Sequence, residues 1–396
     1  MNILLKNLSS KAKTLLFSYL LVELVAPIIY VFINAYIWRA TDSFLGVILF
    51  NLSSFFTLPL GFFVAGKLFH RIELKYIHII GLIFSGLSTI LPLILNLKDI
   101  SGVMLIGSFV GFGSGIYWST RINLNLKETI DSERNLFASV EQVIGIIAGI
   151  ITPVIIGLFI DSKMFPLNTS YLISGIFAFT VFLIGGLVIV RGNHGTPLMN
   201  LGFNIKVDKE WTSVRLLKLS NGITDGFLMF VPSILILTLF KSEGSLGIAT
   251  SLTLIFTAIF ISVIGKLTNS KHRIKMYGIS QVSYLIGALS LFLLPLPFNF
   301  ILYLLSSQIS GSLTTVSSTP IFFGIIEKKN EENDFKYIFD MEIFINLGRA
   351  IATTIFLVLF LSSNPTLYLY APIVVVIIRI VIYLYSIKEI RNKQSL

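Results

Sequence analysis

Seven ionisable side chains lie inside long apolar stretches of this sequence. They are Glu23, Glu141, Asp225, Asp340, Glu342, Arg349 and Arg379. A carboxylate withdrawn from water holds a proton more readily than one in water, so it can load and release a proton. An arginine in the same surroundings needs a carboxylate, a polar cavity or an anionic ligand. These residue types therefore suit proton transfer and the binding of charged groups.

Glu23 and Asp225 each lie near the centre of a predicted helix, at 14–37 and 214–240. Two interpretations stay open for both residues. The first is a carboxylate that couples to protons or contacts a substrate, because a charge buried in lipid normally faces a cavity or a partner. The second is a carboxylate that only hydrogen-bonds a neighbouring helix.

The predicted helix 337–362 carries a polar face of three residues. Glu342, Asn346 and Arg349 follow one another at spacings of four and three, which places them on one side of a helix. Arg349 falls near the middle of this helix. The spacing is compatible with a structural ion pair and with a site linked to a substrate or a proton, in which Glu342 is a further proton-coupling candidate.

Two more carboxylates, Glu141 and Asp340, lie near the ends of their predicted helices. Each is one or two helical turns from the end, near the basic residues Arg134 and Lys336. A charge at this depth can reach the membrane surface more easily than one at the centre. We therefore predict that Glu141 and Asp340 form gate or interface salt bridges.

A stripe of polar residues runs along the predicted helix 299–325, and aromatic residues lie in the predicted helix 101–120. The candidates in these two helices are Gln308, Ser312, Thr315, Tyr117 and Trp118. A polar stripe in a membrane helix often serves helix packing. The alternative is a mixed polar and aromatic cavity wall, which suits an amphiphilic or lipophilic organic solute. Together with Arg349 and Asn346, these residues are our candidates for substrate contact.

The elements that position these residues require a membrane. The mean hydropathy is +0.87 and only 13% of residues are charged, against roughly 25% in soluble domains. Apolar runs of about 20 residues match the hydrocarbon layer when wound as helices, whereas the alternating segments of a β-barrel are missing. We predict an all-α membrane protein with twelve transmembrane helices, at 14–37, 44–65, 76–97, 101–120, 136–160, 169–190, 214–240, 245–265, 274–296, 299–325, 337–362 and 365–387.

Lysine and arginine residues alternate between the two sides of this predicted array. One side, which includes both termini, holds 24 of the 30, and the other side holds four. Because cytoplasmic loops are enriched in these residues, both termini are predicted to be cytoplasmic, in a prokaryotic cell membrane. The net charge of +10 therefore indicates topology and not a nucleic-acid-binding surface. The longest hydrophilic stretch, 191–213, is a predicted cytoplasmic linker between six-helix bundles at 1–190 and 214–396.

The two predicted bundles resemble each other at a nearly constant offset. The tripeptide Gly-Lys-Leu at 66–68 recurs at 265–267, which is 199 residues later. Glu141 and Asp340 are separated by the same offset. Duplicated halves commonly place a binding site at their interface, near the middle of the membrane.

Twelve helices, cytoplasmic termini, repeated halves and a central loop together resemble the major facilitator superfamily over the whole chain. The segment after the second helix is similar to the signature loop of that family, with Gly66, Arg71 and Lys75 in matching places. His70 stands where the family has an aspartate, and Glu73 where it has a second glycine. In the family that aspartate belongs to a charge relay that holds one conformation closed. The resemblance therefore implies a gate whose details differ in this chain.

The predicted fifth helix has small residues and a proline at spacings of four, namely Gly145, Gly149, Pro153 and Gly157. This pattern is loosely similar to the glycine-proline motif of the exporters of the family. The resemblance implies a secondary active transporter that works by alternating access, and we expect proton-coupled export of a small organic or lipophilic compound. The alternatives are a proton-coupled uptake symporter for a small anionic solute, with Arg349 as the anion partner, and a lipid flippase.

Signatures of enzymes and of nucleotide-driven motors are missing from the sequence. It has no cysteine, and its four histidines form no pair one helical turn apart, so we predict no metal site and no cofactor. Gly111, Gly113 and Gly115 follow no predicted strand, so their predicted role is close helix packing. The resemblance further implies a monomer whose partners are a small-molecule substrate, protons and the lipid bilayer.

Overall fold

The computed structural model describes residues 8–95, 97, 99–129, 131–192, 194, 211–267, 273–294, 297–329, 335–362 and 370–394. This described part is helical and contains no strand. The first half comprises α2 (Ser10–Pro27), η1 (Ile28–Ile33), α3 (Asn34–Thr41), α4 (Phe44–Leu68), α5 (Leu74–Ser88), α6 (Leu91–Ile94), α7 (Ile100–Glu128), α8 (Asp131–Asp161) and α9 (Leu167–Arg191). The second half comprises α10 (Thr212–Leu228), α11 (Val231–Phe240), α12 (Glu243–Leu267), α13 (Arg273–Leu293), α14 (Pro297–Lys329), α15 (Phe335–Phe360) and α16 (Ala371–Gln394).

These helices confirm the predicted all-α membrane fold, because each of the twelve predicted segments is helical over most of the part that the structure describes. Nine helices in the described ranges are long and apolar enough to cross a membrane. The apolar part of α16, Ala371–Tyr385, is shorter. The segment predicted at 214–240 is divided into α10 and α11, which is one reason why the count is lower than twelve.

Prolines account for the main differences between the predicted and the observed helices. The segment predicted at 14–37 contains a π-helical turn, η1, directly after Pro27. Proline lacks the N–H that would continue the hydrogen-bond ladder, so the ladder is interrupted there. Pro92 and Pro232 lie in the first turns of the short helices α6 and α11, where a missing N–H costs nothing, and the helix before each of them has ended. The predicted helices 76–97 and 214–240 are therefore each two helices.

The chain forms two compact units. One consists of Met1–Leu201 with Ser233–Leu252, and the other of Gly202–Pro232 with Thr253–Leu396. The predicted division into bundles at 1–190 and 214–396 stays a prediction. Most of the predicted linker at 191–213 lies outside the described residues.

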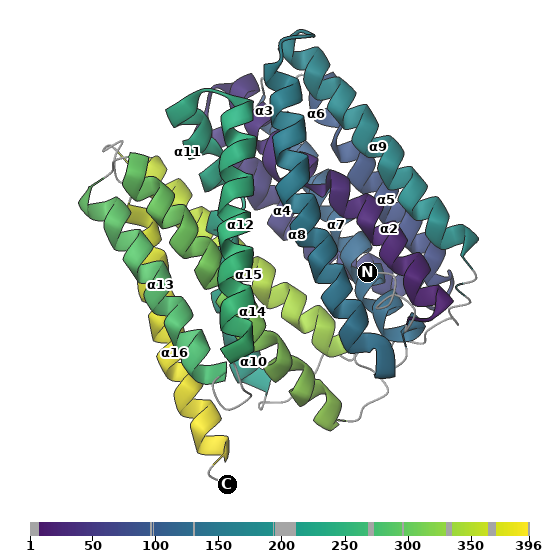
Figure 1. Ribbon diagram of the computed structural model, residues 1–396, viewed down its shortest axis with the longest axis vertical. Coiled ribbons are helices and arrows are strands. Elements are labelled where there is room, and N and C mark those ends of the chain that lie inside the picture. The colour runs from purple at the N-terminus through teal and green to yellow at the C-terminus, as the bar shows by residue number, and fades with distance from the viewer. Residues whose placement is uncertain are drawn as a thin grey trace. The chain divides into compact units, whose positions relative to one another are not determined.

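Glycines allow the closest helix packing in the first unit. Helices α4 and α7 run along each other (Figure 1). A Cβ atom added at Gly111 would lie 2.1 Å from the carbonyl oxygen of Ser54, and one at Gly115 would lie 2.1 Å from that of Leu58. These distances are far below a van der Waals contact, so the predicted packing role of these glycines is confirmed.

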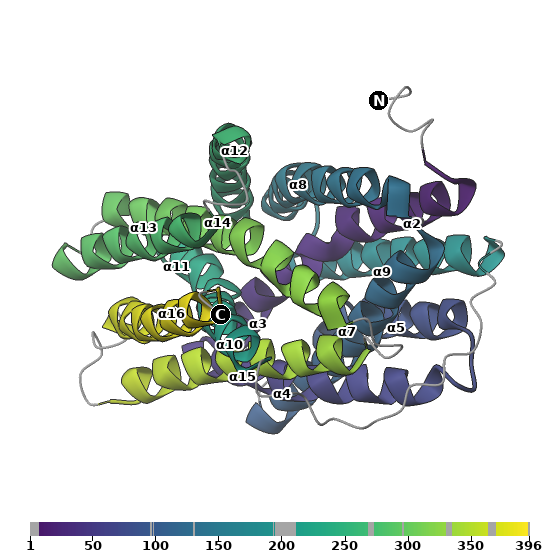
Figure 2. The same ribbon diagram turned by 90° about the horizontal axis from the view of Figure 1, so that it is seen from below.

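In the second unit, glycines likewise allow close packing of two helices, α10 and α15 (Figure 2). A Cβ atom at Gly222 would lie 1.9 Å from the carbonyl oxygen of Ile345, and one at Gly226 would lie 2.5 Å from Cα of Arg349. The two backbones therefore touch at this level. This contact brings the acidic residue of α10, Asp225, beside the charged face of α15.

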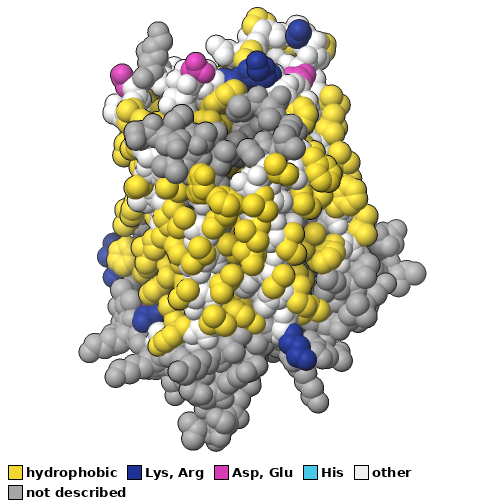
Figure 3. Space-filling model, turned by 90° about the vertical axis from the view of Figure 1, so that its left-hand side faces the viewer, with side chains coloured by type: hydrophobic (Ala, Val, Ile, Leu, Met, Phe, Trp, Pro, Cys, Tyr) yellow, Lys and Arg dark blue, Asp and Glu magenta, His cyan; other side chains and the backbone are white. Residues whose placement is uncertain are grey.

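Apolar side chains cover the middle of the face shown in Figure 3, whereas Lys and Arg side chains lie towards both of its ends and Asp and Glu side chains at its upper end. The exposed apolar residues of α13 and α16 include Ile279, Val282, Ile286, Ile377 and Val381. Soluble monomers rarely expose a contiguous apolar surface of this kind. The surface and the apolar helices together identify an integral membrane protein.

Candidate functional site

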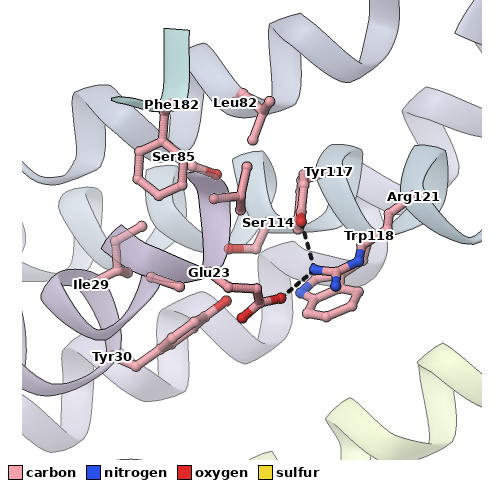
Figure 4. Close-up of a pocket in the computed structure, with 12 residues that line it drawn as sticks. Glu23, Ile29, Tyr30, Leu82, Ser85, Ser114, Tyr117, Trp118, Arg121 and Phe182 are labelled. Carbon is pink, nitrogen blue, oxygen red and sulfur yellow. Dashed lines mark hydrogen bonds and ion pairs between the residues drawn. The ribbon is translucent and has the colours of Figure 1, made fainter. Parts of the chain in front are cut away.

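Arg121 is the centre of a charged cluster in the first unit. Helix α7 continues to Glu128 and not to the predicted end at residue 120, so Arg121 lies within the helix, and its side chain is only 6% exposed. Its Nη1 donates to Oε1 of Glu23 on α2 at 2.6 Å (Figure 4). Its Nε donates to Oε1 of Glu141 on α8 at 2.9 Å, and Nη2 lies 2.7 Å from the same oxygen. One arginine therefore joins three helices.

Aromatic side chains enclose the guanidinium group. Its central carbon lies 4.5 Å from the ring centroid of Tyr19, 4.9 Å from that of Trp118 and 5.7 Å from that of Tyr117. The hydroxyl of Tyr117 also accepts a hydrogen bond from Nη1 at 2.7 Å. Rings at these distances attract a cation and exclude water, which strengthens the ion pairs that remain.

The cluster has two carboxylates for one guanidinium. If Glu23 and Glu141 are both ionised, it carries one negative charge in excess. Either carboxylate can then take up a proton while Arg121 keeps an ionised partner. Protonation of both would leave a buried, unpaired arginine, which is strongly unfavourable. The geometry therefore leaves Arg121 with an ionised partner when one of the two carboxylates is neutral.

A small cavity of about 30 Å³ opens beside this cluster (Figure 4). Its polar lining residues are Glu23, Ser85, Ser114 and Arg121, and its apolar and aromatic ones are Val22, Ala26, Ile29, Tyr30, Leu82, Tyr117, Trp118 and Phe182. This volume holds about one water molecule. Of the two carboxylates, Glu23 is the one that lines the cavity, so it is the one that a proton can reach from there.

The second unit contains a chain of four polar residues, all of them predicted site residues. Nη2 of Arg349 lies 3.2 Å from Oδ2 of Asp225, and Nη1 donates to Oδ1 of Asn346 at 3.1 Å. The amide nitrogen of Asn346 donates to Oε1 of Glu342 at 2.8 Å. The charged face predicted on 337–362 is thus present, and α10 supplies its carboxylate partner.

A larger cavity of about 170 Å³ borders this chain of residues. It is lined by Lys218, Asn221, Thr224, Asp225, Gly311, Thr314 and Ile345. Most of these side chains can form hydrogen bonds, so this cavity is more polar than the one beside Arg121. On α14, the predicted candidates Gln308 and Ser312 are half-buried, whereas the side chain of Thr315 lies outside the described residues.

Asp340 does not belong to this chain of residues. It accepts hydrogen bonds from Nη2 of Arg215 at 2.7 Å and from Nε1 of Trp211 at 2.9 Å. Both partners belong to the same unit as Asp340. Glu141 likewise has its partner, Arg121, within its own unit. The gate role of these two carboxylates stays a prediction.

The segment predicted as a signature loop is a turn between α4 and α5. Gly66 is buried near the end of α4. Arg71 donates from Nε to Nε2 of His70 at 3.2 Å, and Nζ of Lys75 lies 2.9 Å from a carboxylate oxygen of Glu73. The two residues that depart from the family pattern are therefore the contacts of its basic residues.

A further ionic cluster occurs at the start of α12. Nη2 of Arg39 donates to Oε2 of Glu243 at 2.9 Å, and the hydroxyl of Tyr171 donates to Oε1 at 3.1 Å. Asp161 accepts hydrogen bonds from the backbone N–H groups of Glu243 and Gly244, at 3.1 and 2.9 Å. A carboxylate at this position stabilises the first turn of a helix. This cluster was not predicted from the sequence.

Sequence reasoning also missed Arg121 and Lys218, because both were counted among the basic residues of cytoplasmic segments. A signal for Arg121 was present. The residues after it, from Ile122 to Glu128, include no glycine or proline that would end the helix. A tyrosine lies one turn before Arg121 and an asparagine one turn after it. In the described part of the chain, no group of three or more histidine or acidic residues could hold a metal ion.

Membrane-crossing helices with charge clusters and cavities buried among them are typical of solute transporters. The profile of the Major Facilitator Superfamily matches residues 14–352, and the chain belongs to this family of transporters. The resemblance seen in the sequence is thereby confirmed.

Two bacterial relatives are similar in sequence. The uncharacterized protein YqgE of Bacillus subtilis (strain 168) is 25% identical over 377 residues, which cover 92% of this chain and 86% of that protein. An uncharacterized protein encoded in the sodM 3' region of Geobacillus stearothermophilus is 28% identical over 131 residues, 33% of this chain and 61% of that protein. Neither name states a substrate.

Solved structures of transporters share the fold. A bacterial homologue of the iron transporter ferroportin, in an inward-facing state, has a TM-score of 0.68 and 12% identity, covering 96% of this chain and 98% of its own. A POT family transporter in complex with 5-aminolevulinic acid has a TM-score of 0.70 and 12% identity, covering 96% of each chain. The nucleoside transporter NupG has a TM-score of 0.69 and 14% identity, covering 96% of this chain and all of its own. At these identities the likeness shows the fold alone.

Proposed function

We propose that the protein is a proton-coupled secondary transporter that works by alternating access and exports a small organic compound. The observation that carries the proposal is the pair of carboxylates, Glu23 and Glu141, on one buried arginine. Such a cluster can exchange one proton without leaving Arg121 unpaired. A carboxylate that changes its protonation state inside a membrane protein is the chemistry that proton coupling requires.

Glu23 is the residue that we assign to the proton. Its side chain is 22% exposed and lines the cavity beside Arg121. When Glu23 is protonated, its bond to Arg121 changes from an ion pair to a weaker hydrogen bond, and Glu141 keeps the arginine neutralised. The position of α2 relative to α7 can then respond to the proton, because Glu23 and Arg121 belong to these two helices.

The chemical nature of the substrate follows from the cavity wall. The residues beside Glu23 include Ile29, Leu82, Trp118 and Phe182, which favour an organic solute over an inorganic ion. The small-residue pattern of the fifth helix supports export. Gly145 lies against Glu23, whose Oε2 would be 3.9 Å from an added Cβ atom, so this pattern and the proton site adjoin.

Uptake of an anionic solute through Arg349 is less favoured, because Asp225 and Asn346 already bind that guanidinium. Lipid flipping remains the alternative that an assay must separate. Compounds that accumulate differently in cells lacking and overexpressing the protein identify the cargo. A fluorescent lipid analogue in liposomes tests for flipping.

The proposal is tested by the substitution Glu23→Gln in liposomes loaded with the compound identified in this way. We expect transport driven by a proton gradient to be lost, whereas counterflow exchange, which needs no net proton movement, is retained. Asp99→Asn is the matched control, because Asp99 is an exposed residue that precedes α7. Driven transport at the wild-type rate in Glu23→Gln would remove the proton role from this residue.

A further inference from the structure

Arg379 on α16 is a completely buried cation, and no carboxylate among the described residues pairs with it. Its side chain has a relative exposure of 0%, and none of the ion pairs among the described residues includes it. Both Nη atoms lie 3.3 Å from Oγ of Ser310, and Nη2 lies 3.4 Å from Oγ1 of Thr314. Its Nε finds no hydrogen-bond partner within the described part of the chain. Arg379 therefore differs from Arg349 and Arg215, each of which binds an aspartate.

The neighbours of Arg379 do not neutralise its charge. The guanidinium carbon lies 4.8 Å from the ring centroid of Tyr284, a distance at which an aromatic face attracts a cation. Two hydroxyls and one ring stabilise a cation, but they add no negative charge. A buried cation that lacks a counter-charge is unfavourable, and in membrane proteins such residues mark sites for charged ligands. An anion near Arg379 would remove this cost.

A cavity lies directly beside these hydroxyls. Thr314 contacts Arg379 and also lines the polar cavity of about 170 Å³. Gly311 lines the same cavity, and an added Cβ atom at this glycine would have no neighbouring atom within 4 Å. The space in front of this part of α14 is therefore open. It is large enough for a carboxylate or phosphate group and several water molecules.

The rest of the cavity wall suits a negative group as well. Lys218 provides a second cation, and the side chains of Asn221 and Thr224 can donate hydrogen bonds. The one carboxylate of the wall is Asp225, whose charge is matched by Arg349. A second carboxylate, Glu342, acts on Lys218 and is linked through Asn346 to Arg349. Among these described residues three cations face two carboxylates once Arg379 is included, so the balance of charge is positive.

We propose that this cavity binds an anionic group and that Arg379 is its counter-charge, so the compound that the protein transports is an organic anion. The proposal rests on the transport function proposed above and deepens it, because it names the substrate class. Thr314 and Asn221 hold the anionic group by hydrogen bonds, and Arg379, which contacts Thr314, supplies the electrostatic attraction.

Binding can be tested without knowledge of the natural substrate. The purified full chain in detergent is heated with benzoate, with inorganic phosphate or with benzamide, the neutral counterpart of benzoate, and its melting temperature is followed. We expect at least one of the two anions to raise the melting temperature with saturation, and benzamide to have no effect. Arg379→Gln should abolish this increase, and Arg379→Lys, which keeps the charge, should retain part of it.

A second variant keeps the test valid if Arg379→Gln does not fold. Gly311→Leu leaves Arg379 in place and adds a side chain where the cavity is open, so it should fold and lose the response to anions. A response to anions that is unchanged in Arg379→Gln or in Gly311→Leu would overturn the proposal, as would the lack of any response in the wild type. Glu23→Gln separates the two proposals. The melting temperature of this variant should respond to anions as that of the wild type does. This expectation holds whether or not Glu23 carries the proton, so the anion site and the proton assignment can fail independently.

Discussion

Asp225 and Arg349 lie 124 residues apart in the sequence, yet Oδ2 of the first is 3.2 Å from Nη2 of the second. The glycines of α10 make this possible, since Gly222 and Gly226 let the backbone of α10 touch that of α15. A side chain at either glycine would move the two helices apart. The pair therefore depends on two residues that carry no charge.

Gly222→Ala should destabilise the protein by about 1–3 kcal/mol, because the new methyl group meets a backbone carbonyl 1.9 Å away. The matched control is Gly311→Ala on α14, where the methyl group meets open space. There the better helix propensity of alanine should stabilise the protein by up to about 1 kcal/mol. Thermal unfolding of both variants in the same detergent measures the difference. Equal effects of the two substitutions would contradict the close contact of α10 and α15.

The Asp225–Arg349 pair itself should contribute little to stability. The side chain of Asp225 is 38% exposed and that of Arg349 is 16% exposed, so water screens much of the attraction. A double-mutant cycle with Asp225→Asn and Arg349→Gln should give a coupling free energy of about 0.2–1 kcal/mol. A coupling free energy of several kcal/mol would contradict this prediction, because it would require a pair that is withdrawn from water.

The sequence was sufficient to predict the helices and their approximate ends, because apolar runs of membrane length have few alternative structures. It was also sufficient to predict that Glu342, Asn346 and Arg349 share a face, since that depends only on helical periodicity. It could not reveal their partner Asp225, because no local rule relates α10 to α15.

For Arg121, a local rule was available but placed the residue wrongly, at the membrane surface. A cation that follows an apolar run is typical of a membrane surface, and by this rule the predicted helix ended at residue 120. The carboxylates that keep Arg121 inside the protein lie 98 and 20 residues away, on other helices. Only the folded arrangement distinguishes this arginine from the basic residues of the loops.

The ionic cluster of Arg39 and Glu243 should restrain α12. Glu243→Gln removes the charge that binds Arg39, and we expect α12 to separate from its neighbours more often. Because the chain has no cysteine, Ser251→Cys, at a buried position of α12, introduces the sole thiol. Its labelling by a water-soluble maleimide should become several-fold faster in the Glu243→Gln background. Glu73→Gln is the control and should leave the labelling rate unchanged. If Ser251→Cys is labelled at the same rate with and without Glu243→Gln, the ionic cluster does not restrain α12.

His194 should make stability depend on pH at the end of α9. Burial lowers the pKa of His194, against the opposing effect of Glu128, whose Oε2 lies 3.6 Å from Nδ1. In the unfolded chain the imidazole has its ordinary pKa, about 6.5, and therefore binds a proton before the folded protein does. Stability should be fully present above that pH and decrease as the pH falls below it.

The substitution His194→Gln should reduce this dependence on pH. The measurement is the melting temperature of wild type and variant between pH 8 and pH 5, and the variant should show the smaller decrease. Lys11 also contacts Glu128, at 2.8 Å, so Lys11→Gln serves as a control for the remaining charges of this cluster. An equal decrease in wild type and His194→Gln would exclude the histidine as the cause.

The central claim is that Glu23 and Glu141 exchange one proton on Arg121. Infrared difference spectra, recorded while the pH of the purified protein is lowered, detect the protonation of carboxyl groups directly and need no substrate. We predict a carboxyl band that disappears in Glu23→Gln and persists in Asp225→Asn. If the band has its full amplitude in both Glu23→Gln and Glu141→Gln, the cluster on Arg121 does not carry the proton.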